Sequence, residues 1–225
     1  MRKHAFLGIA VVAAALLSTA FARTQAPLHD DMLRIDTGDI RGPGCSTTNN
    51  AAGMIDPMTT PPGTPLFNHT SRPGLGVFPT CNPILAPDGH QVTWGEYKAA
   101  QGDATIKCIN TGTHTALHFS GLLPKGTYSV WVFVVNPNPP PPFLAGGTLG
   151  RTALSENHFI ASGAGEGQIS RTTPAEQLSV FGSVGSCFLD SPAQLHLVYH
   201  SDGLTHGTVP GPTDTWVVNA RFFLP

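Results

Sequence analysis

The stretch LHFSGLLPKGTYSVWV, residues 117–132, decides the fold. Its first part alternates, because Leu117 and Phe119 are apolar whereas His118 and Ser120 are polar, which is typical of a strand with one buried face. A proline and two glycines follow, and the run after them is rich in β-branched and aromatic residues. The stretch therefore predicts two consecutive strands joined by a short connection.

Runs of the same kind recur on both sides of this stretch, with turn residues between them. They predict strands at 104–110, 113–120, 127–135, 158–162, 168–172, 194–200 and 215–223. Only 12% of the residues are charged, whereas 25 are glycine and 21 are proline, a composition that favours short strands and many turns. We expect an all-β fold, an antiparallel β-sandwich of the immunoglobulin-like or jelly-roll-like kind, over residues 84–225.

Residues 23–83 have a different character. They are dense in Pro, Gly and Thr and show little periodicity, which predicts an irregular N-terminal arm. Thr93 and Glu96 then have the spacing of a capping box, and helix-compatible residues follow up to Gln101, before Gly102. One short helix is expected there.

The first 22 residues have the features of a signal peptide. A basic start is followed by an apolar run and by the small-x-small sequence Ala20-Phe21-Ala22, which predicts cleavage after Ala22. The apolar run is too short to span a bilayer, so no membrane insertion is expected after signal removal. We expect a secreted or periplasmic protein whose partner lies outside the cytoplasm. The formal net charge of −2 argues against a nucleic-acid partner.

The four cysteines all follow the expected cleavage site, where an oxidising compartment allows them to pair. No CxxC spacing occurs, so a redox motif and a zinc knuckle are disfavoured. Three pairings are open. We favour Cys45 with Cys81 and Cys108 with Cys187, because each pair would either cross-link a loop-rich region locally or cross-link two strands.

Two parts of the sequence resemble known groups of proteins. Leu122, Pro124 and Tyr128 resemble the tyrosine corner of fibronectin type III and other immunoglobulin-like sandwiches, which implies a sandwich. A wider part of the chain resembles a loosely defined group of exported bacterial β-sandwich proteins of unassigned function. That resemblance implies a bacterial source and makes the cysteines and histidines features of the fold. Its matching pieces are 93–97, Lys107-Cys108, 112–114, 122–131, 182–187 and 196–207.

Histidines carry the candidate chemistry. Alternation puts His114 and His118 on one face of their strand, and His196 and His200 on one face of another. Residues four apart on a strand are about 13 Å apart, so neither pair can bind one ion by itself. If the two strands were neighbours, a zinc or copper(II) site could form. Its predicted ligands are His118, His196, His200, Asp202 and His206.

Two classes of function follow. The first is an exported non-catalytic binding or structural β-sandwich module of unknown ligand, without a cofactor, in which the histidines are ordinary strand residues. The second is a secreted zinc- or copper-binding metalloprotein. Signatures of catalysis are weak, since Asp36-Thr37-Gly38 matches the aspartic protease tripeptide but has no second copy, and Gly-x-Ser-x-Gly is absent.

Overall fold

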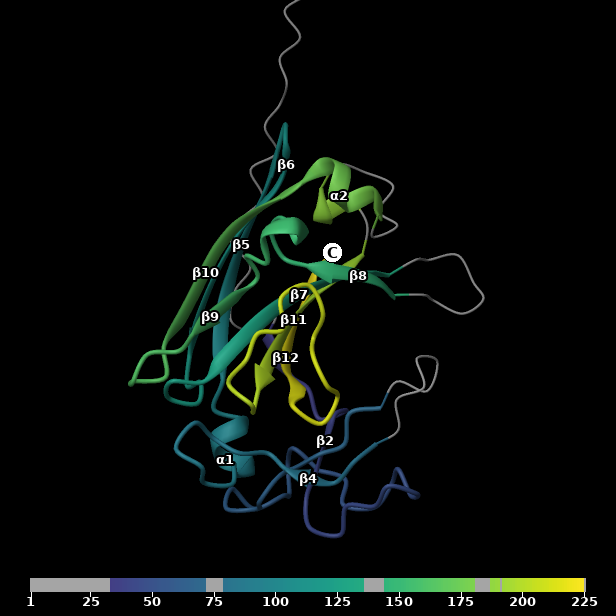
Figure 1. Ribbon diagram of the computed structural model, residues 1–225, viewed down its shortest axis with the longest axis vertical. Coiled ribbons are helices and arrows are strands. Elements are labelled where there is room, and N and C mark those ends of the chain that lie inside the picture. The colour runs from purple at the N-terminus through teal and green to yellow at the C-terminus, as the bar shows by residue number, and fades with distance from the viewer. Residues whose placement is uncertain (1–32, 72–78, 136–143, 181–186, 191, 225) are drawn as a thin grey trace, which may run out of the picture.

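A computed structural model describes residues 33–71, 79–135, 144–180, 187–190 and 192–224 (Figure 1). Over these ranges the protein is an antiparallel β-sandwich with few short helices, as the sequence predicts. The expected signal peptide, residues 1–22, lies outside the described residues. Among the residues that are described, no helix is both long and apolar enough to cross a membrane.

The larger sheet has the strand order β1-β12-β11-β7-β8, and β9 pairs with β7 beside β8. The predicted run at 127–135 is confirmed as β7, and the runs at 158–162, 194–200 and 215–223 as β9, β11 and β12, with ends shifted by one or two residues. The bounds are β1 (Leu33–Ile35), β7 (Thr127–Val135), β8 (Leu144–Thr148), β9 (His158–Ile160), β11 (Ala193–His200) and β12 (Trp216–Leu224).

The smaller sheet has the order β10-β6-β5, and all of its pairs are antiparallel. It consists of β5 (Gln101–Ile109), β6 (Gly112–Ser120) and β10 (Gly167–Pro174). Burial alternates along β6 as predicted, since Leu117 and Phe119 are buried whereas His118 and Ser120 are exposed. One face of this sheet therefore packs inward and the other is polar and faces solvent.

The main core lies between the two sheets. Phe119 of the smaller sheet packs against Phe159 and Phe222 of the larger one, with ring centroids 5.6 and 6.0 Å apart. Tyr128 and Tyr199 lie on the same inner face, 5.3 Å apart. Burying each such ring is worth about 2 kcal/mol, so this aromatic cluster holds the sheets together.

The connection between β6 and β7 passes from one sheet to the other. Here the hydroxyl of Tyr128 accepts a hydrogen bond from the Leu123 backbone N–H at 3.0 Å. Tyr128 is almost fully buried, and burial raises the pKa of its hydroxyl, so the group stays neutral. The bond fixes the crossing where β7 enters the larger sheet.

The described part of the predicted arm packs onto one end of the sandwich (Figure 1). A third small sheet forms from β2 (Ile40–Arg41), β3 (Phe67–Asn68) and β4 (Asn82–Pro83). Ile40 and Leu66 are fully buried in the main core. The Asn68 side chain donates to the backbone carbonyl of Trp216 at 2.8 Å, so this segment is tied directly to β12.

Within the described residues, two short α-helices and two 3-10 helices complete the fold. The capping box is confirmed at α1 (Trp94–Tyr97), where the side chains of Thr93 and Glu96 cap the helix reciprocally. The helix ends earlier than expected, because Gln101 already belongs to β5. The helix α2 (Ala175–Val180) was not predicted, and neither were η3 (Thr152–Leu154) and η4 (Phe188–Asp190).

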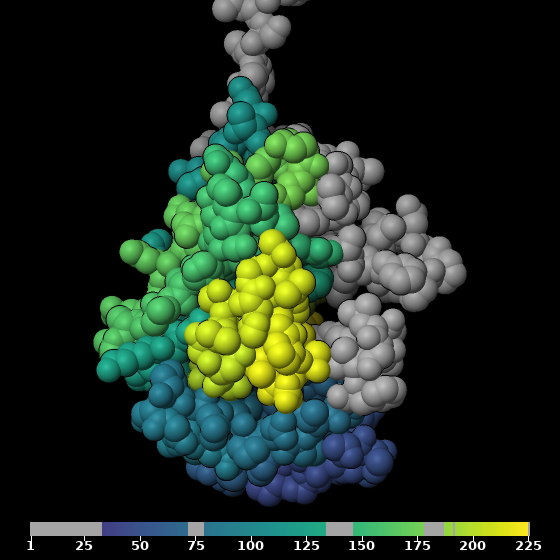
Figure 2. All heavy atoms as spheres, in the orientation of Figure 1, coloured from purple at the N-terminus to yellow at the C-terminus, as the bar shows by residue number. Residues whose placement is uncertain are grey.

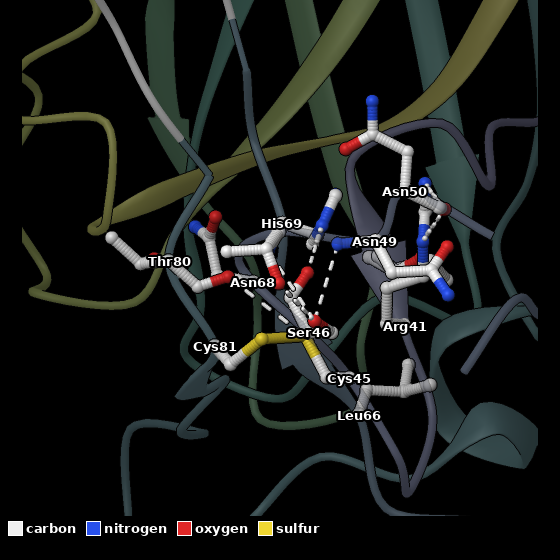
Figure 3. The surroundings of a disulfide bond; sticks show 12 residues. Arg41, Cys45, Ser46, Asn49, Asn50, Leu66, Asn68, His69, Thr80 and Cys81 are labelled. Carbon is white, nitrogen blue, oxygen red and sulfur yellow. Dashed lines mark hydrogen bonds between the residues drawn. A yellow bond between two sulfur atoms is a disulfide. The ribbon is translucent and has the colours of Figure 1, made fainter. Parts of the chain in front are cut away.

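Both favoured disulfides are confirmed, Cys45–Cys81 and Cys108–Cys187, with Cα atoms 5.9 and 5.5 Å apart. Figure 3 shows the first, which lies beside Ser46, whose carbonyl is 3.0 Å from Nε2 of His69. The second joins β5 to the segment that begins η4. Two disulfides indicate an oxidising environment, extracellular or periplasmic.

Candidate metal site

The two histidine pairs lie on different sheets. His114 and His118 belong to β6 in the smaller sheet, whereas His196 and His200 belong to β11 in the larger one. All four side chains point away from the core, which fills the space between the sheets. The condition that the two strands be neighbours is therefore not met, and His118 cannot share an ion with the residues of β11.

His118 has ordinary surroundings. Its side chain is 59% exposed, and Nδ1 lies 3.3 Å from a carboxylate oxygen of Asp103 on the neighbouring strand β5. An exposed pair of this kind contributes little to stability. His118 thus behaves as a polar residue of the solvent-facing side of the smaller sheet.

His196 is buried, but it lies far from the other predicted ligands. Its ring packs against Phe133 with centroids 4.3 Å apart, and Nε2 is 2.9 Å from the amide oxygen of Gln194. Four strand residues separate it from His200, a distance of about 13 Å. His196 therefore takes part in the packing of the outer face and does not join the cluster described next.

The structure brings together the remaining three predicted residues, His200, Asp202 and His206. One ligand atom from each lies within 4.8 Å of the others. His200 ends β11, and the other two lie on the loop at residues 201–215 that leads to β12. This part of the chain is at the molecular surface, in yellow in Figure 2.

A chain of hydrogen bonds from two side chains of β7, Ser129 and Trp131, holds the His200 ring. Nε2 of its ring lies 2.7 Å from Oγ of Ser129 on β7, and the same oxygen accepts a hydrogen bond from the indole N–H of Trp131 at 2.9 Å. The ring is 1% exposed, and its other nitrogen, Nδ1, is buried without a hydrogen-bond partner. An unsatisfied buried nitrogen costs about 1–3 kcal/mol, so this atom needs an explanation.

Burial also determines the charge of His200. Burial is the main cause that lowers the pKa of the ring; Asp202 opposes it, His206 and His158 add to it, and together they bring the pKa to about 4. The ring is therefore neutral at physiological pH. A neutral imidazole is the form that binds a metal.

Asp202 and His206 form a close pair above this ring. Nε2 of His206 lies 2.6 Å from Oδ2 of Asp202, and both side chains are about one-fifth exposed. Burial raises the pKa of Asp202, but hydrogen bonds from the backbone N–H of Leu204, the His206 ring and the Thr215 hydroxyl outweigh this and lower it. Asp202 is thus ionised and offers a carboxylate.

The local backbone holds His206 in a specific position. His206 has a positive φ of 52°, which is uncommon for a residue with a side chain. Gly211 packs closely against its ring: a Cβ at Gly211 would lie 2.3 Å from a ring carbon of His206. Only glycine fits there, so the loop is built around the imidazole.

These three side chains suit a borderline metal ion. Two imidazoles and one carboxylate are common ligands of zinc and of copper(II). In a tetrahedral site with bonds near 2 Å, neighbouring ligand atoms are about 3.4 Å apart. The ligand atoms of His200, Asp202 and His206 lie within 4.8 Å of one another, so side-chain shifts of about 1 Å would bring them to that spacing. The ion would then replace the proton in the hydrogen bond between Asp202 and His206.

A second histidine with acidic neighbours does not have this geometry. His90 contacts Asp88 through Nδ1 at 2.5 Å and Glu96 through Nε2 at 2.8 Å, and all three are well exposed. The hydrogen bonds to Asp88 and Glu96 raise the pKa of His90. Because the carboxylates bind opposite nitrogens of the ring, the three cannot converge on one ion.

The sequence predicted the three clustered residues but not the neighbouring side chains, Ser129 and His158. Ser129 lies in a strand with no distinguishing pattern, and His158 lies alone in its run. Only the strand register relates them to His200.

Comparison with known proteins gave no further information about function. Neither a known family, nor a curated protein, nor a solved structure matches this chain significantly. The class that the observations define is that of a disulfide-bonded antiparallel β-sandwich.

Proposed function

We propose that this chain is an exported binding module that holds one zinc or copper(II) ion with His200, Asp202 and His206. The observation that carries the proposal is the buried Nδ1 of His200, which has no hydrogen-bond partner. Since Ser129 is bonded to Nε2, Nδ1 is the nitrogen left to bind an ion. A bound ion would satisfy this atom and remove the cost of leaving it unpaired.

The surroundings of His200 match those of a metal-binding imidazole. Histidine ligands usually donate their other ring N–H to a fixed acceptor, which orients the ring. Oγ of Ser129 can accept both from Nε2–H of His200 and from the indole of Trp131, because a hydroxyl oxygen has two lone pairs. In that arrangement the lone pair of the His200 ring is on Nδ1.

Export is supported by two separate features. Residues 1–22 have the pattern of a signal peptide, and both disulfides require oxidising conditions to persist. We propose that the protein is released from the membrane after cleavage and works in the periplasm or outside the cell. The role assigned to the ion is binding, either to capture the metal or to hold the 201–215 loop in shape.

Metal analysis of the mature protein tests the proposal. After removal of metal with a chelator, the protein is offered zinc or copper(II), dialysed and analysed for bound metal. We expect about one ion per chain, and loss of that ion in His200→Ala and in His206→Ala. His90→Ala is the matched control, because it removes an exposed histidine with two carboxylate neighbours, and it should keep the ion.

Two outcomes would contradict the proposal. The first is that wild-type protein keeps no metal under these conditions. The second is that His206→Ala binds as much as the wild type whereas His90→Ala loses metal. The chain would then be a β-sandwich module whose histidines serve only packing and solvation.

A further inference from the structure

The three clustered ligands leave one position of a tetrahedral ion unfilled. Structural zinc sites have four protein ligands, whereas sites with three keep a position for water or a substrate. Whether a fourth ligand is within reach decides between a closed and an open site. His158 of β9 is the residue to examine.

The strand register places His158 on the same face as His200. On one side of β7, Ser129 is paired with His158, and on its other side Ser129 is paired with Val198 of β11. Residues directly opposite each other in an antiparallel pair have side chains on the same face, with Cβ atoms about 5 Å apart. Ser129 itself bonds the His200 ring, so His158 and His200 belong to the two strands that flank Ser129.

The ring of His158 is oriented by a hydrogen bond to the backbone. Nδ1 lies 2.9 Å from the backbone carbonyl oxygen of Ser155. A carbonyl can only accept, so Nδ1 carries a proton, and in the neutral ring the lone pair is on Nε2. A bond from the second nitrogen to a backbone carbonyl is the support that metal-binding histidines commonly have.

The turn that carries His158 also contacts the loop of the cluster. A Cβ placed on Gly207 would lie 3.3 Å from Oγ of Ser155, so the backbone next to His206 packs against the residue that holds the His158 ring. The side chain of His158 is exposed and lies outside the group of three, so binding requires the loop of the cluster and the ring of His158 to move toward each other.

We propose that His158 is the fourth ligand, bound through Nε2, and that it closes the site into three imidazoles and one carboxylate. This inference rests on the proposed function. A closed site implies that the ion serves binding and loop structure, since no position remains for a substrate. It also links β9 to the 201–215 loop, which leads from β11 to β12.

Pulsed electron paramagnetic resonance on the copper(II)-loaded mature protein tests this assignment, because it counts coordinated imidazoles through their remote nitrogens. We expect three imidazoles in the wild type and two in His158→Ala. A competition titration should show at least a tenfold loss of copper(II) affinity in that variant. His118→Ala is the control, an exposed histidine beside a carboxylate on the other sheet, and it should keep three imidazoles.

The outcomes separate this inference from the proposed function. If the wild type binds copper(II) with two imidazoles and His158→Ala is unchanged in count and affinity, the fourth-ligand assignment is wrong while the three-residue site stands. If the wild type binds no stoichiometric copper(II), both are wrong. Because His158 is exposed, its replacement should leave the fold intact, which the circular dichroism spectrum of each variant will show.

Discussion

Oγ of Ser129 lies 2.7 Å from Nε2 of His200, and both side chains are buried on the outer face of the larger sheet. The two residues come from neighbouring strands, β7 and β11, and Oγ of Ser129 also accepts a hydrogen bond from the indole N–H of Trp131. One hydroxyl therefore holds the position of the ring on which the proposed site is built.

Replacing Ser129 with alanine should weaken both metal binding and the fold. The change leaves ring nitrogens of His200 and Trp131 unpaired, which costs about 2 kcal/mol of the free energy of unfolding. Loss of the orienting bond should reduce zinc affinity about 10- to 100-fold. Zinc titration calorimetry and chemical denaturation of the same samples measure the two effects.

Trp131→Phe is the control for that substitution. It removes the other partner of Ser129 and some apolar packing but keeps the bond to His200. We expect lower stability and nearly unchanged zinc affinity. Equal affinity loss in both variants would mean that the outer face acts only through general packing.

Gly211→Ala should disturb the site through His206. A Cβ at this position would lie within 2.3 Å of the imidazole, and the backbone φ of 89° is unfavourable for alanine. The ring must move, so zinc affinity should fall by at least tenfold. Equilibrium binding with a competing chromophoric chelator measures it.

Gly203→Ala separates the clash from the backbone strain. Gly203 lies in the same loop with a similar φ of 73°, but a Cβ there has no heavy atom within 4 Å. Both variants should lose about 1 kcal/mol of stability from strain, yet only Gly211→Ala should lose zinc affinity. A similar affinity loss in Gly203→Ala would show that the packing on His206 is not the cause.

The stability of the chelator-treated protein should fall on acidification. The folded-state pKa of His200 is about 4, below the ordinary value of 6.5, because burial disfavours the charged ring. Between these values the unfolded state binds more protons, so the free energy of unfolding rises with pH across that window, by about 3 kcal/mol in total. Below the folded-state pKa the contribution is lost.

His200→Gln removes this titration. Denaturant unfolding at several pH values should give a shallower pH dependence between pH 4 and 6.5 for the variant than for the wild type. Identical slopes in the two proteins would indicate that His200 is protonated in the folded state and does not keep a free lone pair.

The two disulfides should contribute similar stabilities. Cys45–Cys81 and Cys108–Cys187 close loops of 36 and 79 residues, and the chain-entropy model gives about 4 kcal/mol for each. Replacing either pair with alanines should lower the free energy of unfolding by that order, as measured in urea. A negligible change for Cys45–Cys81 would mean that the N-terminal segment folds apart from the sandwich.

Local patterns were sufficient to predict most strands. The alternation of Leu117 and Phe119 with polar residues identifies β6 and its buried face, and Thr93 with Glu96 identifies the start of α1. The strand β8 was missed because Gly146 and Gly147 have no side chains with which to show a pattern. Short pairings such as β2 with β3 depend on tertiary contacts and give no periodic signal.

The candidate site could be predicted only in part, for a different reason. His200, Asp202 and His206 are close in sequence, so a turn brings them together. Which strands are neighbours is not encoded in local alternation, and this is why the sequence could include His118 among the ligands only on the condition that its strand lies beside β11. His158 comes from a strand distant in sequence, and only its pairing with Ser129 shows its relation to His200.

The most direct test of the account is a crystal structure of the mature protein soaked with zinc, with diffraction data collected on both sides of the zinc absorption edge. We predict one strong anomalous peak within bonding distance, about 2 Å, of Nδ1 of His200 and of ligand atoms of Asp202 and His206. The account is contradicted if those crystals show zinc only at exposed pairs such as His118 with Asp103, and none beside His200.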